Sequence, residues 1–402
     1  MVTKGSFSSP KGLVVGLTSQ MIVKWLSVRG DFMGVSTFRA IALGALIVAS
    51  GSASAQEACG PQKIIFDTDF NLFGDDGQAF ILAAQAHAAG QIQILGMTLV
   101  AGNTWIEEQR PIAAKAVERV GLEADIPVFA GADRPLLHSH ASFEEEKALL
   151  GVGDGYYGAW SHPKPKSDAD VEISPDGAAQ RTKVQEKHAV DFIIETVRAN
   201  PGQVTILAIG PLTNIALAIR KAPDIVPLIK RIVYMGGAFD VPGNTMPAAE
   251  FNVWFDPDAA KIVYREPIEQ IFIPLDVTNS ARFDFGIFER IWKANPVIAR
   301  IDSRAKPSPK ASAPKFAQFW DQLAVAYVID PTLATNVETR WIDVETTFGA
   351  NYGRTMSYSH EFPRGHFLQQ GKIVNRFDLK RFEGYFVSTM SKPLPVRSKN
   401  KP

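Results

Sequence analysis

Aspartates crowd together where one apolar run of the chain ends. The segment IIFDTDFNLFGDDGQAF places Asp67, Asp69, Asp75 and Asp76 within ten positions. Carboxylates this close repel one another, and burying them without compensation is costly. A divalent cation is the simplest compensation, and oxygen ligands with no His or Cys close by in sequence favour Ca²⁺ or Mg²⁺ over zinc. The cluster therefore predicts a site for a hard metal ion.

Taken alone, the four aspartates also fit a purely structural role and two rival chemistries. Asp75 and Asp76 could simply cap a helix that begins near Gly77, which is worth about 1 kcal/mol, although Asp67 and Asp69 would stay unexplained. An Asp-x-Asp at a strand end also serves phosphatases with an aspartyl nucleophile, and proteins that bind nucleotide sugars through a metal. The local pattern does not separate these chemistries.

The elements that must hold the aspartates follow from the alternation of apolar runs and helical spacing after Lys63. This alternation predicts βαβ units around a mainly parallel sheet with helices on both faces. The predicted strands cover residues 63–66, 92–100, 126–130, 204–209, 231–235 and 271–275. The predicted helices cover residues 78–89, 106–120, 186–199, 212–221 and 257–264. The expected fold class is α/β, one Rossmann-like domain, with the aspartates at the carboxyl edge of the sheet where ligands bind.

The composition of the chain limits its possible partners and its possible disulfides. Lys plus Arg and Asp plus Glu both number 42, so no basic field favours nucleic acid as a partner. Cys59 is the single cysteine, and it cannot form an internal disulfide.

A secretory signal is predicted near the amino terminus. Residues 33–55 contain Arg39, the apolar run AIALGALIVA and small residues at a cleavage position. The alternative is a membrane anchor, but the run is shorter than the roughly 20 residues that span a bilayer. We expect an extension and cleavable signal over 1–55, a catalytic domain over 56–395 and a polar tail over 396–402. The mature protein would then be periplasmic or secreted, without a stable membrane anchor.

Two polar stretches interrupt the alternation. Residues 161–182 are rich in Pro, Lys and Asp, and residues 304–315 (RAKPSPKASAPK) are basic and rich in Pro, Ser and Ala. Both bury too little to order themselves, so we expect surface loops. The second loop leads directly to Trp320 and Asp321, and it fits either a tolerated insertion or a mobile lid.

Further motifs follow the acidic cluster in a fixed order: LGMTLVAGN, ILAIGPLTNIALAI, IVYMGGAF, GNTMPAAEFNVWFDPDAA, PLDVT and WDQLAVAYVIDP. Together with the cluster they resemble the inosine-uridine type of nucleoside hydrolase family, over residues 64–331. The resemblance implies the nucleoside hydrolase fold and a Ca²⁺ cofactor. It also implies hydrolysis of the N-glycosidic bond of a small-molecule ribonucleoside to free base and ribose, for salvage. A strand-end Asp phosphatase and a non-catalytic sugar or nucleoside binder remain the alternatives, and the sequence leaves open whether the chain forms a homo-oligomer.

The resemblance also assigns roles to residues. The metal ligands would be Asp69, Asp76, Asp321 and the main-chain carbonyl of Ile209. The residues facing the ribose hydroxyls would be Asp75, Asn103, Asn244, Glu250 and Asn252, although Asn103 and Asn244 follow glycines and could instead form turns. Asp69 would act as general base towards a metal-bound water, with Asp75 beside the sugar and Asp67 supporting the site from behind.

The chain departs from the family pattern at the base side of the site. Many pyrimidine-accepting members have His immediately before the late Asp, whereas this chain has Trp320. An indole delivers no proton in this pH range, so we expect Trp320 to stack on a purine, as in the purine-preferring branch; the alternative is a core residue. A second aromatic wall could come from Tyr156, Tyr157 or Trp160.

Two further features do not match the family. Residues 70–74 lengthen the loop between Asp69 and the Asp-Asp pair by two positions. His138 and His140 match no family position, and we expect them to be solvent-exposed loop residues.

Overall fold

The computed structural model describes residues 60–151, 156–167, 170–302, 315–362 and 367–395. The expected extension and signal (1–55), Cys59, residues 304–314 and the tail 396–402 lie outside these ranges. Within them, no helix is long and apolar enough to cross a membrane.

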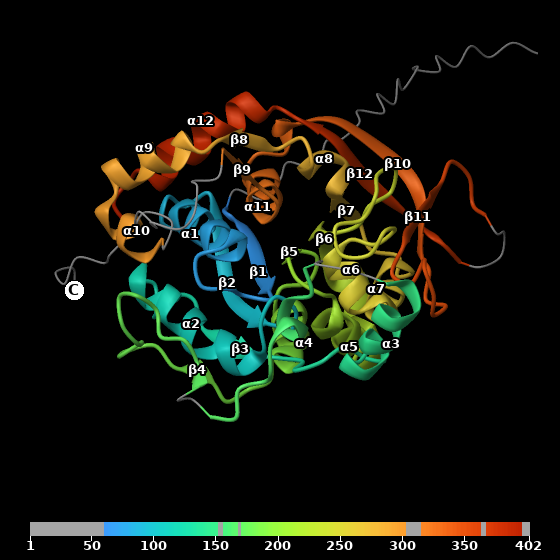
Figure 1. The fold of residues 1–402 in the computed structure, drawn as a ribbon. Helices are drawn as coiled ribbons and strands as arrows, with labels where there is room; N and C mark the ends of the chain where they lie inside the picture. Colours follow the sequence, from blue (N-terminus) through green and yellow to red (C-terminus); the bar gives the residue numbers. More distant parts are fainter. Residues whose placement is uncertain (1–59, 152–155, 168–169, 303–314, 363–366, 396–402) are drawn as a thin grey trace, which may run out of the picture. The chain divides into compact units, whose positions relative to one another are not determined.

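A ten-stranded sheet forms the centre of the described domain, in the order β11-β10-β12-β7-β6-β5-β1-β2-β3-β4 (Figure 1). Its strands are β1 (Gln62–Thr68), β2 (Ile92–Leu99), β3 (Val128–Ala130), β4 (Val184–Gln185), β5 (Val204–Ala208), β6 (Ile229–Met235), β7 (Gln270–Ile273), β10 (Ala334–Val344), β11 (Thr355–Tyr358) and β12 (Gln369–Phe377). All neighbours from β12 to β4 are parallel, whereas β10 is antiparallel to both β12 and β11. A separate hairpin pairs β8 (Arg282–Asp284) with β9 (Phe316–Gln318).

Helices cover both faces of the sheet. The two faces carry separate apolar cores because successive side chains of a strand point to opposite sides: Ile64 and Phe66 belong to one core, and Ile65 belongs to the other. The first core includes α1 (Asp75–Ala88), α2 (Ile106–Arg119), α9 (Gly286–Ala294), α10 (Pro296–Ile301), α11 (Asp321–Ile329) and α12 (Leu379–Met390). The second includes α4 (Ala189–Ala199), α5 (Thr213–Lys221) and α7 (Pro257–Tyr264).

Short elements complete the described chain. They are the helices α3 (His140–Leu150), α6 (Phe251–Phe255) and α8 (Leu275–Thr278), and the 3₁₀ turns η1 (Gly158–Ser161), η3 (Pro223–Leu228) and η5 (Pro331–Leu333).

The α/β class and the mainly parallel sheet predicted from the sequence are confirmed, and each predicted strand and helix corresponds to an observed one. The sequence patterns do not predict β10, β11 and β12. The first half of β10 is largely exposed, so it lacks the continuous apolar run by which the buried parallel strands are recognised.

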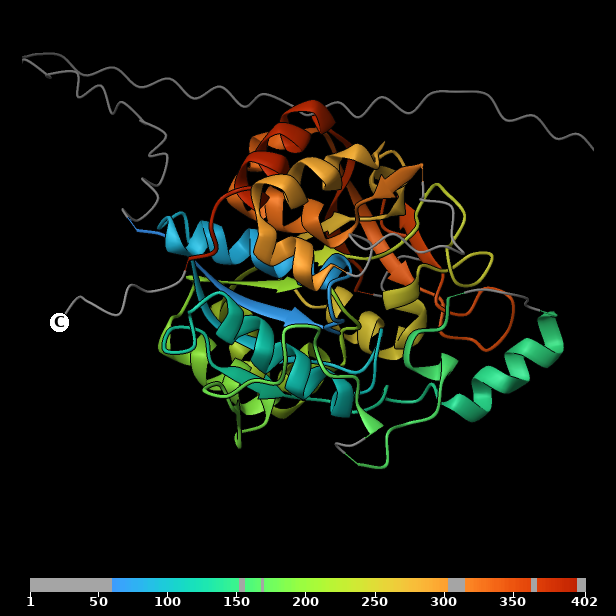
Figure 2. The same ribbon diagram turned by 60° about the vertical axis from the view of Figure 1, so that its left-hand side comes forward.

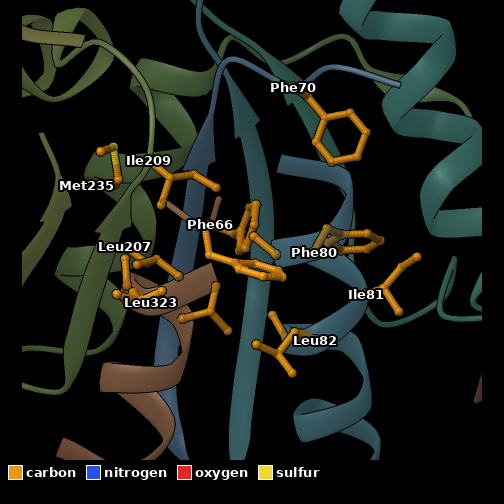
Figure 3. Close-up of a cluster of buried hydrophobic side chains, with 14 of the residues drawn as sticks. Phe66, Phe70, Phe80, Ile81, Leu82, Leu207, Ile209, Met235 and Leu323 are labelled. Carbon is orange, nitrogen blue, oxygen red and sulfur yellow. The ribbon is translucent and has the colours of Figure 1, made fainter. Parts of the chain in front are cut away.

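The lengthened loop after Asp69 is anchored in the core rather than spread over the surface. Phe70 is fully buried and meets Phe80 edge to face, with ring centroids 6.0 Å apart. Figure 3 shows Phe66, Phe70 and Phe80 in one cluster with Ile209 and Met235. The extra residues therefore hold the start of α1 against β1, directly beneath the predicted acidic site.

The polar segment 161–182 is a surface loop, as predicted, in its described residues, yet it is fixed by two charged side chains of α2. Arg119 donates to both carboxylate oxygens of Asp176, at 2.9 Å each. Glu118 accepts from the backbone N–H groups of Gln180 at 2.7 Å and Arg181 at 2.5 Å. A loop that buries little apolar surface is therefore held by hydrogen bonds to charged groups.

Glu118→Gln should weaken this anchor in a pH-dependent way. Burial raises the pKa of Glu118, but the amides of Arg181 and Gln180 and the Lys115 ammonium outweigh it and lower the pKa from 4.5 to about 2. Because the folded-state pKa is the lower one, the contribution is complete above pH 4.5 and is lost as the pH falls towards 2. We expect the variant to lose about 2 kcal/mol of unfolding free energy at pH 7, with a difference that shrinks in acid.

Denaturant titrations of both proteins between pH 7 and pH 3 would measure this effect. Glu123→Gln is the matched control, because Glu123 forms an ion pair with the exposed guanidinium of Arg181 among the described residues. A wild-type advantage that stayed constant down to pH 3 would contradict the prediction.

Candidate active site

The order of the strands creates a crevice at the carboxyl end of β1. The chain continues from β1 to β2 on one side, whereas β5 lies on the other, so the connections diverge there. A cavity of about 460 Å³ lies at this point, a size typical of small-molecule sites. It is lined by Asn71, Asp75, Asn103, Tyr156, Ile209, Met235, Asn244, Glu250, Phe251, Asn252, Trp320 and Asp321.

Most of the predicted site residues meet in this cavity. Asp69 and Asp76 are absent from the lining because they are fully buried just below it. One side chain connects both of them to the cavity: the Asn103 amide donates to Asp76 Oδ2 at 2.9 Å and to Asp69 Oδ1 at 3.2 Å. The Asn103 backbone N–H adds a bond of 2.7 Å to Asp69 Oδ2.

Close backbone approach fixes Asp69 between two glycines. A Cβ atom on Gly102 would lie 2.2 Å from Asp69 Oδ2, and one on Gly210 would lie 2.8 Å from the Asp69 backbone nitrogen. Neither position can carry a side chain without moving the carboxylate. The glycines after β2 and β5 thus leave room for Asp69 between these strands.

The carboxylates raise one another's pKa. Burial raises the pKa of Asp76 to about 7, and the charge of Asp75 adds to the shift. Burial and then the charge of Asp76 hold the pKa of Asp69 well above its usual range. The pKa of Asp321 is raised by burial and then by the charges of Asp75, Asp76 and Asp69. No Lys or Arg is among the described residues that line the cavity, so no side-chain cation offsets this charge.

Three of these carboxylates fit a metal ion. Oxygen atoms of Asp75, Asp76 and Asp321 lie within 4.8 Å of one another. The Oδ2 atom of Asp321 is buried without a hydrogen-bond partner in the described part of the chain, which is costly unless a cation contacts it. An all-oxygen set suits a hard cation. The cluster can therefore hold a metal ion.

The tightest group differs in one member from the predicted ligand set. Asp75 belongs to it, whereas both oxygens of Asp69 are engaged by Asn103. Asn71 supports Asp75 by donating to its Oδ1 at 3.1 Å. Asp69 still lies beside Asp76, because Asn103 bridges the two. The predicted main-chain ligand, Ile209, lines the same cavity, and its carbonyl accepts from Asn252 at 3.3 Å.

Asp67 lies behind the cluster, as expected from the sequence. It is fully buried, and its Oδ1 accepts from Thr98 at 2.5 Å and from Asn214 at 2.9 Å. Burial raises its pKa to about 7 although these two bonds oppose the shift. Neither Thr98 nor Asn214 lines the cavity, whereas Asn103 links Asp69 to it, so these contacts suit Asp67 to a supporting role behind the site.

The short helix α6 carries the polar side of the cavity. Its N-cap Glu250 accepts from the backbone N–H of Asn252 at 2.9 Å and from that of Gly237 at 3.0 Å. The Asn252 amide donates to the Met235 carbonyl at 3.0 Å, and Asn244 accepts from the N–H of Phe251 at 2.9 Å. These bonds hold three predicted ribose-facing side chains on one stretch of backbone.

Aromatic side chains also line the cavity. Trp320 and Tyr156 both line the cavity, and Tyr156 meets Phe251 edge to face at 5.0 Å. The Tyr156 hydroxyl donates to Asn103 Oδ1 at 2.7 Å. Of the three candidates for a second aromatic wall, Tyr156 alone lines the cavity, since Tyr157 and Trp160 are buried in a neighbouring aromatic cluster.

The prediction of solvent exposure is correct for His140 and wrong for His138. His140 is exposed at the start of α3, but His138 is buried among Trp160, Trp254 and Tyr352. The prediction of a solvent-exposed loop rested on the lack of a matching family position, and only the packing reveals the aromatic surroundings.

Sequence reasoning also missed some lining residues, namely Asn71, Met235 and Phe251. Asn71 lies in the two-residue enlargement of the loop, and the other two adjoin motif residues. Their closeness in sequence to predicted site residues was the signal that could have identified them as lining residues.

Comparisons with known proteins agree with this geometry. The family model described as inosine-uridine preferring nucleoside hydrolase matches residues 64–384. An inosine-uridine preferring nucleoside hydrolase of Leishmania major is 31% identical, over 76% of this chain and 90% of its own. A pyrimidine-specific ribonucleoside hydrolase, RihB, of Escherichia coli is 29% identical, over 73% of this chain and 87% of its own.

A shorter match and a solved structure extend the comparison. A protein of Schizosaccharomyces pombe is 41% identical over 54% of this chain, and the match spans 62% of that protein. The structure of a purine-preferring ribonucleoside hydrolase from Gardnerella vaginalis superimposes with a TM-score of 0.62 at 25% identity, over 82% of this chain and 98% of that one.

Asp321→Asn should have opposite effects on stability with and without a divalent cation. A carboxylate whose folded-state pKa is raised costs stability at every pH above its unfolded-state value. In chelator at pH 7 we therefore expect the variant to have a higher Tm than the wild type. In excess Ca²⁺ or Mg²⁺ the order should reverse, because the variant lacks one ligand.

Thermal unfolding followed by circular dichroism, with each cation and with chelator, would measure both Tm values. Asp191→Asn is the control, since it removes an exposed carboxylate on α4. Equal cation-induced increases in Tm for wild type and Asp321→Asn would show that Asp321 binds no metal.

Proposed function

Because this chain belongs to the inosine-uridine preferring nucleoside hydrolase family, whose members hydrolyse the N-glycosyl bond of ribonucleosides, we propose that it is a Ca²⁺-dependent hydrolase that prefers purine ribonucleosides. The observation that carries the proposal is the composition of one cavity. Carboxylates that need a cation, amides and carboxylates suited to a sugar, and an aromatic wall suited to a base all line it.

The polar side of the cavity suits ribose. Vicinal hydroxyls need both donors and acceptors, and Asn103, Asn244, Glu250 and Asn252 offer amide and carboxylate groups together. Asp75 contributes a carboxylate between this side and the metal cluster. We assign the ribose to these residues, with its anomeric carbon towards Asp69 and Asp76.

Charge accounts for the bond cleavage. As the bond from the anomeric carbon to the base breaks, the sugar becomes oxocarbenium-like, and carboxylates around it stabilise the positive charge. A bound cation would lower the pKa of a coordinated water. We assign to Asp69, which lies beside Asp76 under the bridging Asn103 amide, the role of general base that accepts the proton of the attacking water. Asn103 holds both oxygens of this carboxylate in place.

The base preference rests on Trp320. Its indole lies next to Asp321 and lines the cavity, so a base bound beside the metal site would meet it. Tyr156 and Phe251 supply further aromatic surface. The names of the similar proteins point to purines, pyrimidines or both, so the preference is argued from these side chains alone.

The phosphatase alternative fits the structure poorly. Its nucleophile would be Asp67, whose Oδ1 accepts from Thr98 and Asn214, and neither of these residues lines the cavity. A phosphate site would also need a cationic side chain, and no Lys or Arg is among the described residues that line the cavity.

Assays of the mature protein with inosine, adenosine, uridine and a phosphomonoester, in Ca²⁺ and in chelator, test the proposal. We expect free ribose from the purine nucleosides in Ca²⁺, little in chelator, and no phosphate release. Asp69→Asn should lower kcat by about 10³-fold, since it removes the general base. Ribose from none of the nucleosides would refute the proposed activity, and retention of each nucleoside unchanged would indicate a binding protein.

Trp320→Ala should impair purine nucleosides selectively. Stacking of a base on an aromatic ring is worth about 1–3 kcal/mol, so we expect kcat/KM for inosine to fall about tenfold and that for uridine to fall less. Trp292→Ala controls for loss of an indole, because Trp292 packs in α9 away from the cavity. Equal losses for inosine and uridine in steady-state assays would count against stacking.

A further inference from the structure

His138 and Glu146 form a buried pair outside the cavity. Both side chains are inaccessible to solvent, and His138 Nε2 lies 3.5 Å from Glu146 Oε1. Neither atom has a hydrogen-bond partner among the described residues. Two buried polar atoms that face each other in this way need a proton between them, because otherwise two lone pairs would meet.

The other ring nitrogen shows where the imidazole protons must be. His138 Nδ1 lies 3.0 Å from the Trp254 carbonyl oxygen and 3.3 Å from that of Phe255. Carbonyl oxygens only accept, so Nδ1 carries a proton and donates. The shared proton then lies either on Nε2, giving an ion pair, or on Glu146, giving a neutral pair; in both forms a donor of one residue faces an acceptor of the other at 3.5 Å.

Glu146 contacts the same short helix, α6, that His138 contacts. Its Oε2 accepts from the Trp254 indole N–H at 3.0 Å. Aromatic rings of Trp160, Trp254 and Tyr352 surround the imidazole, with centroids 4.7–5.0 Å away. The pair is thus shielded from water, and its hydrogen bonds are stronger than they would be in solvent.

These contacts place the pair at the end of α6. Trp254 and Phe255 are the last residues of this helix, and their carbonyls are among those that a helix leaves without internal partners. His138 caps them, while Glu250 caps the other end and Asn252 lies in the first turn. A helix of five residues has little stability of its own, so its caps determine where it lies.

The helix α3 that carries Glu146 meets the rest of the domain through few buried side chains. Among its residues only Phe143 and Glu146 are buried, and Figure 2 shows the helix projecting from the rest of the domain. Phe143 packs against Trp160 and Trp254, and Glu146 is the buried polar residue of the helix. Its described hydrogen bond and its contact with His138 both lead to α6.

We infer that His138 and Glu146 share a proton in a buried pair that positions α6, and through α6 the ribose-facing Glu250 and Asn252. The inference rests on the proposed function for the meaning of that side of the cavity. Both are positioning residues, since neither lines the cavity.

Glu146→Leu compared with Glu146→Gln tests the inference. Leu removes the acceptor for Trp254 and the partner of His138. Gln can accept from the indole and donate to Nε2, so it preserves both contacts. We expect Glu146→Leu to raise KM for inosine about tenfold, because a small displacement of binding groups has effects of this order, with a smaller change in kcat. Glu146→Gln should restore KM to within about twofold of wild type.

Hydrogen exchange of the peptide covering α6 provides a readout without substrate. We expect the Asn252 and Val253 amides, which donate to Glu250, to exchange faster in Glu146→Leu and at the wild-type rate in Glu146→Gln. A purely structural role would lower kcat through a smaller folded fraction and leave KM unchanged, and that result would overturn the inference. Unchanged KM and unchanged exchange would also overturn it.

His138→Asn keeps the test decisive if Glu146→Leu does not fold. Asn retains a donor near the position of Nδ1 but has no atom facing Glu146, so we expect KM to rise about fivefold, the effect of one hydrogen bond. Wild-type KM and exchange in this variant would refute the pair. An inactive wild type would refute the proposed function instead, and the exchange measurements would still decide whether the pair positions α6.

Discussion

Mutual repulsion among buried carboxylates is the constraint on which the rest of the site depends. Asp75 and Asp321 line one small cavity with Asp69 and Asp76 buried just below it, and no Lys or Arg lines it within the described residues. Neutral hydrogen-bond donors offset part of this repulsion. Thr68 and Asn103 donate to Asp76, and Asn103 also donates to Asp69. Even so, one buried oxygen of Asp321 has no donor in the described part of the chain. The fold thus leaves a negative charge that a divalent cation can neutralise.

The parallel part of the fold could be predicted from the sequence because burial on both faces leaves a plain signal. The strands β1, β2, β3, β5, β6 and β7 are apolar runs, and helices with regular spacing separate most of them. The antiparallel strands β10 and β11 were not predictable in this way. The first half of β10 is largely exposed and contains mostly polar residues, so it forms no apolar run. A continuous apolar run therefore indicates that a segment is buried, and an exposed strand leaves no such run in the sequence.

In the candidate site, too, some features could be predicted from the sequence and others could not. Asp76, Asn103 and Asp321 could be located because short motifs place them at strand or helix ends, where a parallel sheet gathers its ligands. Their partners could not be inferred from spacing. Tyr156 donates to Asn103, and His138 lies in an aromatic cluster with Trp160, Trp254 and Tyr352. Such contacts join segments far apart in the chain, and no local pattern encodes them.

The position of Asp321 has a consequence for the lifetime of the folded state. Asp76 opens α1 near the start of the domain and Asp321 opens α11 near its end, yet both belong to one ligand group. A cation held by both would act as a reversible cross-link that closes a very long loop. Closure of a long loop restricts the unfolded chain strongly, and unfolding would first have to release the ion. In a compartment where the ion is abundant, the same carboxylates that destabilise the ion-free chain would slow its unfolding and proteolysis.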